Sequence, residues 1–208
     1  MSATTPPPAA LLAELRAPGR IRLIAVGGSA GAIDALGVIL GRLPAAFPLP
    51  LVVVVHLPRR RRSVLPEVLA ARCRAPVREA LDKQPLEAGG VYVGPPDYHT
   101  LLDEGPAVAL SVDEPVNFSV PSIDVLFESA ARVMGPALLG VLLSGANEDG
   151  AAGLAAIGAA GGLGVVQSPA EAAAPVMPAA GLARLPAAFV LDAQGIGQAL
   201  AMLGAPED

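Results

Sequence analysis

The sequence predicts an α/β fold: a doubly wound, mostly parallel β-sheet flanked by helices. Four short apolar runs rich in β-branched residues are nearly continuous rather than alternating, as in parallel strands covered on both faces. These runs end at Val26, His56, Ser144 and Ser168. Helical patterns separate the runs, and such alternation of strand and helix builds parallel sheets. The helical patterns cover residues 32–43, 63–74, 122–134 and 151–160.

One stretch departs from this alternation. From residue 89 to residue 112 the chain consists of short apolar pieces separated by proline, glycine and Asp-Glu-Gly turns, with no room for a helix. That texture is typical of antiparallel strands joined by tight turns. We therefore expect an antiparallel hairpin near residues 89–112, inserted in the parallel sheet or added to its edge.

The composition fits a single globular domain preceded by a short proline-rich segment. The chain has 208 residues, of which 53% are hydrophobic and 16% charged, so it can bury a full core. We assign residues 1–20 to the proline-rich N-terminal segment and residues 21–208 to the domain. The apolar window at 151–166 is built mainly from alanine and glycine rather than leucine and isoleucine, which argues against a membrane span.

The charge and the cysteine content indicate which partners the protein can bind and in which cellular compartment it occurs. A net charge of −5 and a pI near 5.0 leave no electrostatic footprint for nucleic acid. The single cysteine, Cys73, cannot form an internal disulfide, which fits a reducing compartment. The N-terminus has no basic residue ahead of an apolar stretch, unlike a signal peptide. We expect a cytoplasmic protein that binds no nucleic acid.

The turn after the first predicted strand contains one hydroxyl, Ser29, within the run IAVGGSAGAIDAL. A dinucleotide site would need G-x-G-x-x-G and an acid at the end of the second strand, and a nucleotide P-loop would need a lysine in the turn. The turn instead matches G-x-S-x-G from Gly27 to Gly31, which lifts a serine oxygen clear of a sheet at a helix N-terminus. Glycine turns of this length are common in α/β proteins, so the pattern by itself is weak evidence for a nucleophile.

Two further strand ends carry the groups that would activate such a serine. His56 closes the second strand and is a candidate base, although a histidine at a strand end often only bonds a nearby carbonyl. The loop after the strand ending at Ser144 holds two acids, Glu148 and Asp149, of which one could orient the imidazole or simply cap the next helix. The carboxyl ends of parallel strands meet at one sheet edge, so the coincidence of these groups favours a catalytic site.

Six segments in the same order resemble the catalytic domain of CheB-type protein-glutamate methylesterases of bacterial chemotaxis. The segments are GGSAGA, VVHLP, GGVYVGPPDYH, PVNFSVPSIDVLF, VLLSGANEDGAAG and SPAEAAAPVMPAAG, and the resemblance runs from about Ile21 to the end of the chain. It implies that Ser29 is the nucleophile, His56 the base and Asp149 the orienting acid. It also implies an oxyanion hole made by the backbone N–H groups of Ala30 and Ala146.

The resemblance further implies a reaction and its partners. The expected reaction is hydrolysis of glutamate γ-methyl esters on a methylated chemoreceptor-like protein through an acyl-serine intermediate, and glutamine deamidation would follow the same course. No cofactor is expected, and one cysteine with two histidines makes a poor metal-ligand set. Such esterases usually carry an N-terminal receiver domain, whereas this chain begins almost at its first strand. We therefore expect any receiver to be a separate partner protein, and contact with membranes only through receptors.

Other residues have weaker assignments. Asn117 is a substrate-binding candidate, and His99 is expected to pack the hairpin rather than to act in catalysis. A basic cluster directly after the second strand is usually a solvated face, but here it could guide an acidic substrate to the site. The cluster consists of Arg59, Arg60, Arg61 and Arg62. Two alternative functions stay open: a serine hydrolase of another ester or amide, and a scaffold of the same fold without catalysis.

Overall fold

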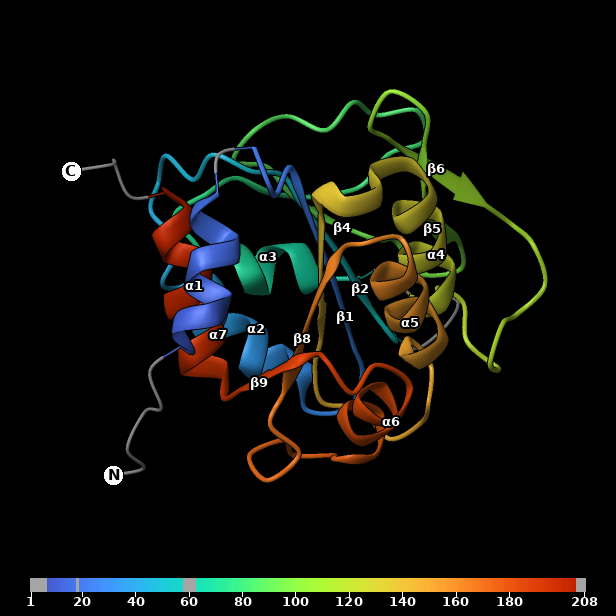
Figure 1. The fold of residues 1–208 in the computed structure, drawn as a ribbon. Coiled ribbons are helices and arrows are strands. Elements are labelled where there is room, and N and C mark those ends of the chain that lie inside the picture. Colours follow the sequence, from blue (N-terminus) through green and yellow to red (C-terminus); the bar gives the residue numbers. More distant parts are fainter. Residues whose placement is uncertain (1–6, 18, 58–62, 205–208) are drawn as a thin grey trace.

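A seven-stranded, fully parallel β-sheet forms the centre of the protein in this computed structural model, which describes residues 7–17, 19–57 and 63–204 (Figure 1). The strand order across the sheet is β3-β4-β2-β1-β7-β8-β9. The strands are β1 (Leu23–Gly28), β2 (Leu51–Val55), β3 (Val77–Glu79), β4 (Val91–Val93), β7 (Leu138–Leu142), β8 (Leu163–Gln167) and β9 (Phe189–Leu191). The predicted fold class is confirmed.

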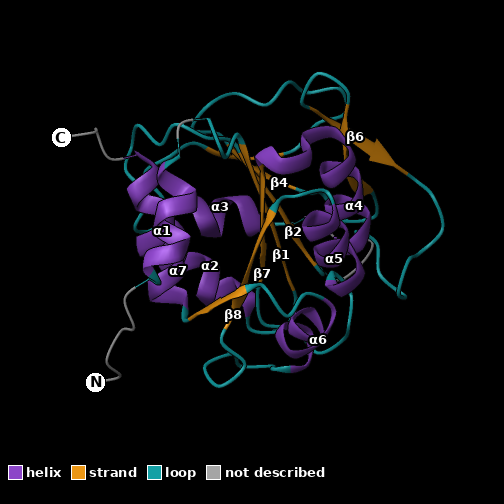
Figure 2. Cartoon of the chain, in the orientation of Figure 1, coloured by secondary structure: helices purple, strands orange, loops and turns teal. Residues whose placement is uncertain are grey.

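Helices cover both faces of this sheet (Figure 2). One layer holds α1 (Ala9–Arg16), α2 (Ala32–Leu40), α3 (Leu65–Ala70) and α7 (Ala193–Ala201), and the other holds α4 (Ile123–Met134), α5 (Ala151–Ala159) and α6 (Val176–Arg184). Two short 3₁₀ turns are η1 (Gly135–Ala137) and η2 (Met202–Gly204). Each layer buries its own apolar cluster against one side of the sheet, which is why the strand residues are apolar on both faces. No helix among the described residues is long and apolar enough to cross a membrane.

The order of the strands reverses at the centre of the sheet. From β1 the chain moves to β2 and β4 on one side, whereas β7, β8 and β9 lie on the other side. The order therefore reverses between β1 and β7, and open α/β sheets bind their ligands outside the carboxyl ends of the strands at such a reversal. Ser29 follows β1 and Asp149 follows β7, so both predicted site residues flank the point of reversal.

The expected hairpin is present but shorter than the stretch that predicted it, and its expected place within or at the edge of the parallel sheet is wrong. Strands β5 (His99–Asp103) and β6 (Ala107–Ser111) pair antiparallel as a separate two-stranded sheet. The preceding strand β4 instead belongs to the main sheet, where it pairs parallel with β2 and β3 and its three residues are buried. The hairpin packs on α4, where the backbone N–H of Leu102 donates to Ser129 Oγ over 3.1 Å.

The N-terminal segment contributes a helix that the sequence did not predict. Within α1, Leu11 and Leu15 are buried against α7 and η2. Because α7 starts at the carboxyl end of β9 and runs back along the sheet, η2 lies at the amino edge, so α1 lies away from the carboxyl edge. The division of the chain into residues 1–20 and 21–208 stays a prediction.

Candidate active site

A sharp strand-to-helix turn presents Ser29 at the carboxyl edge of the sheet. Strand β1 ends at Gly28, and α2 begins only four residues later, which requires Gly31 to adopt a left-handed φ of 79°. The backbone N–H of Ser29 donates to the carbonyl of Ser144 over 2.8 Å, which ties the turn to the chain after β7. At Gly27 a side chain would collide with Ile123, so the glycine allows the start of α4 to approach the strand. Ser29 itself is half-buried and lies three residues before the first residue of α2.

His56 lies beside this turn and is paired with Asp149. The backbone N–H of His56 donates to the carbonyl of Gly28 over 3.2 Å, so His56 and Ser29 follow two hydrogen-bonded strand ends. The distance from His56 Nε2 to Asp149 Oδ2 is 2.7 Å. With Asp149 ionised, Nε2 donates and Nδ1 keeps its lone pair, so Nδ1 is the ring nitrogen able to accept a proton. Nδ1 is 3.4 Å from the hydroxyl of Ser119, a residue that the sequence analysis did not single out for the site.

Asp149 is completely buried, and donors surround its carboxylate. Besides His56, the donors are Asn117 Nδ2 at 2.9 Å, Ser122 Oγ at 2.8 Å and the backbone N–H groups of Ile123 and Asp124 at 2.6 and 3.2 Å. The two backbone groups belong to the first turn of α4, where N–H groups have no partner within the helix. Asp149 therefore caps α4 from across the fold, and the helix dipole favours its negative charge.

This environment keeps Asp149 ionised. Burial alone would raise the pKa of Asp149, but the hydrogen bonds from His56, Asn117, Ile123 and Ser122 outweigh burial and hold that pKa below its ordinary value. An ionised carboxylate opposite Nε2 orients the imidazole and stabilises its protonated form.

A second carboxylate, Asp124, lies next to Asp149 and behaves differently. Its oxygens accept from Gly153 N at 2.7 Å and from Asn117 Nδ2 at 2.8 Å. Burial raises the pKa of Asp124, and the charge of Asp149 adds to that rise, although the two hydrogen bonds oppose it. The Asn117 amide therefore bridges two carboxylates that would otherwise repel each other.

The predicted oxyanion-hole residues lie on two loops of the same edge. Ala30 and Ala146 are both exposed, and their N–H groups take part in none of the backbone hydrogen bonds found within the described ranges. Ser144 joins these loops, because its hydroxyl donates to Ala30 O over 2.7 Å and accepts from Ala174 N over 2.9 Å. A developing oxyanion requires N–H groups that are available as donors, and the role of these two groups stays a prediction.

Among the remaining predicted residues, the structure describes Asn117 and His99 but not the four arginines. Asn117 contacts the carboxylates described above through its amide nitrogen, and its predicted contact with substrate stays a prediction. The four arginines at 59–62 lie outside the described residues. His99 is buried, accepts from Ser122 N at 3.1 Å and donates to Glu114 O at 3.0 Å, so it fastens the hairpin to the start of α4, in line with its expected packing role.

Sequence reasoning missed the groups that position the site. Ser122 reads as the capping residue of α4, yet its hydroxyl donates to Asp149 and leaves the capping to that carboxylate. Asp124 reads as an ordinary acid in a first helical turn. The only available signal was the crowding of polar residues around Pro121, in the segment that runs from Asn117 to Asp124.

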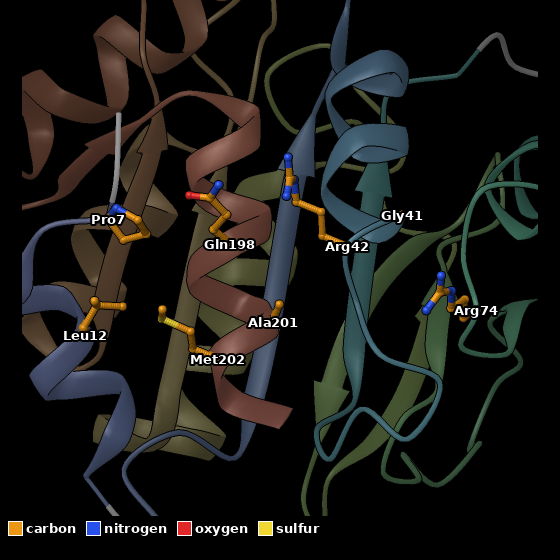
Figure 3. Close-up of a pocket in the computed structure, with 8 residues that line it drawn as sticks. All are labelled: Pro7, Leu12, Gly41, Arg42, Arg74, Gln198, Ala201 and Met202. Carbon is orange, nitrogen blue, oxygen red and sulfur yellow. The ribbon is translucent and has the colours of Figure 1, made fainter. Parts of the chain in front are cut away.

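A pocket of about 570 Å³ elsewhere in the molecule does not belong to this site (Figure 3). Its lining includes Leu12 of α1, Arg42 just after α2 and Met202 of η2. Helix α2 starts at the carboxyl end of β1 and runs back along the sheet, so the pocket lies toward the amino edge, away from Ser29.

The fold is a doubly wound α/β sheet, and Ser29, His56 and Asp149 all follow strands at its carboxyl edge. The family described as CheB methylesterase matches residues 24–200, and the chain belongs to this family.

Individual relatives agree with this assignment. The "Putative protein-glutamate methylesterase/protein-glutamine glutaminase" of Leptospira interrogans is 42% identical over 175 residues, which cover 84% of this chain and 91% of the relative. Protein-glutamate methylesterase/protein-glutamine glutaminase 1 of Anaeromyxobacter dehalogenans is 38% identical over 184 residues, 88% of this chain and 52% of the relative. The crystal structure of the Thermotoga maritima CheB methylesterase catalytic domain superposes with a TM-score of 0.84 at 28% identity, covering 88% of this chain and 98% of that one.

Proposed function

We propose that this protein hydrolyses the γ-methyl ester of glutamate side chains on methylated chemoreceptor-like proteins, and that the same site converts glutamine to glutamate. Membership of the CheB methylesterase family supports the proposal, as do the names of relatives that combine both activities. The observation that carries it is the pairing of buried Asp149 with His56 over 2.7 Å, directly beside the turn that holds Ser29.

In the proposed reaction Ser29 is the nucleophile and His56 the base. Ser29 Oγ attacks the ester carbonyl carbon while its proton moves to His56 Nδ1, because Nε2 is held by Asp149. The negative charge that develops on the carbonyl oxygen is accepted by the N–H groups of Ala30 and Ala146. Asp149 keeps its own charge throughout and stabilises the imidazolium.

Collapse of the tetrahedral intermediate breaks the bond to the leaving group. His56 Nδ1 returns its proton to the departing oxygen, which leaves as methanol, or to the departing nitrogen of a glutamine, which leaves as ammonia. Water then attacks the acyl-serine with His56 again as the base. The products are glutamate and free Ser29.

The test is methanol release from a helical peptide carrying one glutamate γ-methyl ester, compared between the wild type, Ser29→Ala and Ser111→Ala. Ser111 ends β6 and contacts Asp113 rather than the site, so it is a control for losing a hydroxyl. We expect Ser29→Ala to lose activity by a factor on the order of 10⁶ and Ser111→Ala to keep it. Undiminished methanol release by Ser29→Ala would refute the assignment of Ser29 as the nucleophile. No methanol release by a folded wild type would refute the proposed ester substrate.

A further inference from the structure

A strained two-residue turn lies against the catalytic pair. Val116 and Ser119 face each other, with the Ser119 N–H donating to Val116 O over 2.9 Å and the reverse bond spanning 3.2 Å. Between them Asn117 and Phe118 both have left-handed backbones, with φ of 51° and 61°. Two consecutive left-handed residues are typical of a tight hairpin turn. Asparagine tolerates this conformation, but a bulky aromatic residue adopts it at a cost.

Both neighbours of Phe118 contact the candidate catalytic residues. Asn117 Nδ2 donates to Asp149 Oδ1 over 2.9 Å, and Ser119 Oγ lies 3.4 Å from His56 Nδ1. The turn is therefore fixed relative to the Asp149–His56 pair. A substrate whose carbonyl is within reach of Nδ1 must pass close to Ser119 and hence to Phe118.

The phenylalanine ring contributes nothing to the packing of the fold. Phe118 has a relative exposure of 104%, the largest among the exposed apolar residues of the described chain. In Figure 1 the connection after β6 projects from the side of the molecule that carries α4. An aromatic ring held in a strained conformation and open to water gains contact only from another molecule.

The chemistry of the turn indicates an apolar contact. Residues 112–120 read VDEPVNFSV and contain two acids and no lysine or arginine, so this segment offers an acidic protein no ionic attraction. We propose that Phe118 is a specificity-determining residue that packs against an apolar side chain next to the esterified glutamate of the substrate protein. This inference rests on the proposed function, since it assigns a contact to that same substrate.

The test compares two helical peptides, each carrying one glutamate γ-methyl ester. One has leucine, and the other serine, at the positions three and four residues on either side of the ester, which share its helix face. Both are assayed for methanol release with the wild type, Phe118→Ala and Val112→Ala. Val112 is a matched control because it is 79% exposed on the same connection, and no described contact joins it to His56 or Asp149.

We expect the wild type to prefer the leucine peptide by about fivefold or more in kcat/KM, with the preference arising mainly in KM. Phe118→Ala should lose that preference while hydrolysing the serine peptide and p-nitrophenyl acetate as well as the wild type. Phe118→Leu should retain it, because an apolar side chain remains. The effect of the peptide change is compared between the wild type and Phe118→Ala, as in a double-mutant cycle. The difference measures the contact between the Phe118 ring and the peptide separately from any effect of the substitution on the catalytic residues.

Three outcomes would overturn the inference. A leucine preference that survives in Phe118→Ala would show that the ring does not contact the substrate, with the proposed function intact. An equal loss of preference in Val112→Ala would remove the assignment to Phe118. Absence of methanol release from both peptides by a wild type that still turns over p-nitrophenyl acetate through Ser29 would refute the methylesterase proposal, and the inference with it.

Discussion

Replacing Asp149 with asparagine should damage both catalysis and folding, because the buried carboxylate accepts from five donors. Oδ2 accepts from His56 and Ile123 N, and Oδ1 accepts from Asn117, Ser122 and the N–H of Asp124. An amide has only one accepting oxygen, so its NH₂ must face one of these two sets of donors. The less costly placement directs the NH₂ toward the smaller set.

That placement predicts the size of both effects. His56 Nε2 must then accept a hydrogen bond, so its proton moves to Nδ1 and the base disappears, which in serine proteases costs a factor of about 10⁴ in kcat. Ile123 keeps a buried N–H without an acceptor, which costs about 1–3 kcal/mol. Loss of the charge at the N-terminus of α4 costs roughly a further 0.3–1 kcal/mol.

Methanol release and urea unfolding of Asp149→Asn measure the two effects, and Asp124→Asn is the matched control. Asp124 is also a buried carboxylate that accepts from Asn117, but no hydrogen bond joins it to His56 within the described chain. We expect the control to keep kcat within about tenfold of the wild type. A kcat for Asp149→Asn within tenfold of the wild type would refute the tautomer argument, and an unchanged free energy of unfolding would refute the capping argument.

Three further predictions concern acid stability, the oxyanion loops and the cysteine. Because the pKa of Asp149 lies below its ordinary value of 3.8, its contribution to the free energy of unfolding is complete above pH 3.8 and is lost as the pH falls through the lower folded value. Urea midpoints from about pH 5 to about pH 2 should therefore fall more for the wild type than for Asp149→Asn, and parallel profiles would contradict this. Ser144→Ala removes the hydrogen bonds to Ala30 O and from Ala174 N, so kcat for methanol release should fall about tenfold or more. Ser144→Thr is the control because it keeps the hydroxyl. An equal loss of kcat in both variants would contradict the role of that hydroxyl. Burial raises the pKa of the Cys73 thiol, so iodoacetamide near pH 8 should alkylate it about tenfold more slowly in the native than in the urea-unfolded protein. Mass spectrometry measures both rates, and equal rates would contradict this prediction.

The central part of the fold could be predicted because its sequence signals are local. The apolar runs before Gly27, His56, Ser144 and Ser168 became β1, β2, β7 and β8, since buried parallel strands need apolar side chains on both faces. The strands β3 and β9 were missed because each has only three residues, too few to show a period. The helix expected over residues 63–74 is shorter, from Leu65 to Ala70, because Pro66 favours a helix start at this point and the chain turns before Pro76.

The candidate site likewise has a part that the sequence predicts and a part that it does not. Ser29, His56 and the acidic pair Glu148 and Asp149 could be proposed because each follows a strand, and the ends of parallel strands meet at one edge. The choice of Asp149 within that pair came from the resemblance to CheB-type methylesterases. The contacts that support these residues could not be predicted. Ser119 and Asn117 meet the pair because a tight turn folds back on it, and their sequence window shows only a crowding of polar residues, which does not specify that contact.

The sequence by itself determined the parallel sheet, the edge at which the site lies and the residue types that can perform acyl transfer there. Periodicity, strand ends and glycine turns are properties of short windows, so they can be interpreted without knowing the tertiary structure. Only the tertiary structure decided that Asp149 caps α4, that Asp149 holds Nε2 of His56 and that Ser119, the neighbour of the exposed Phe118, approaches Nδ1. Each of these features depends on a contact between segments distant in the chain, which is fixed by the packing of the helices against the sheet.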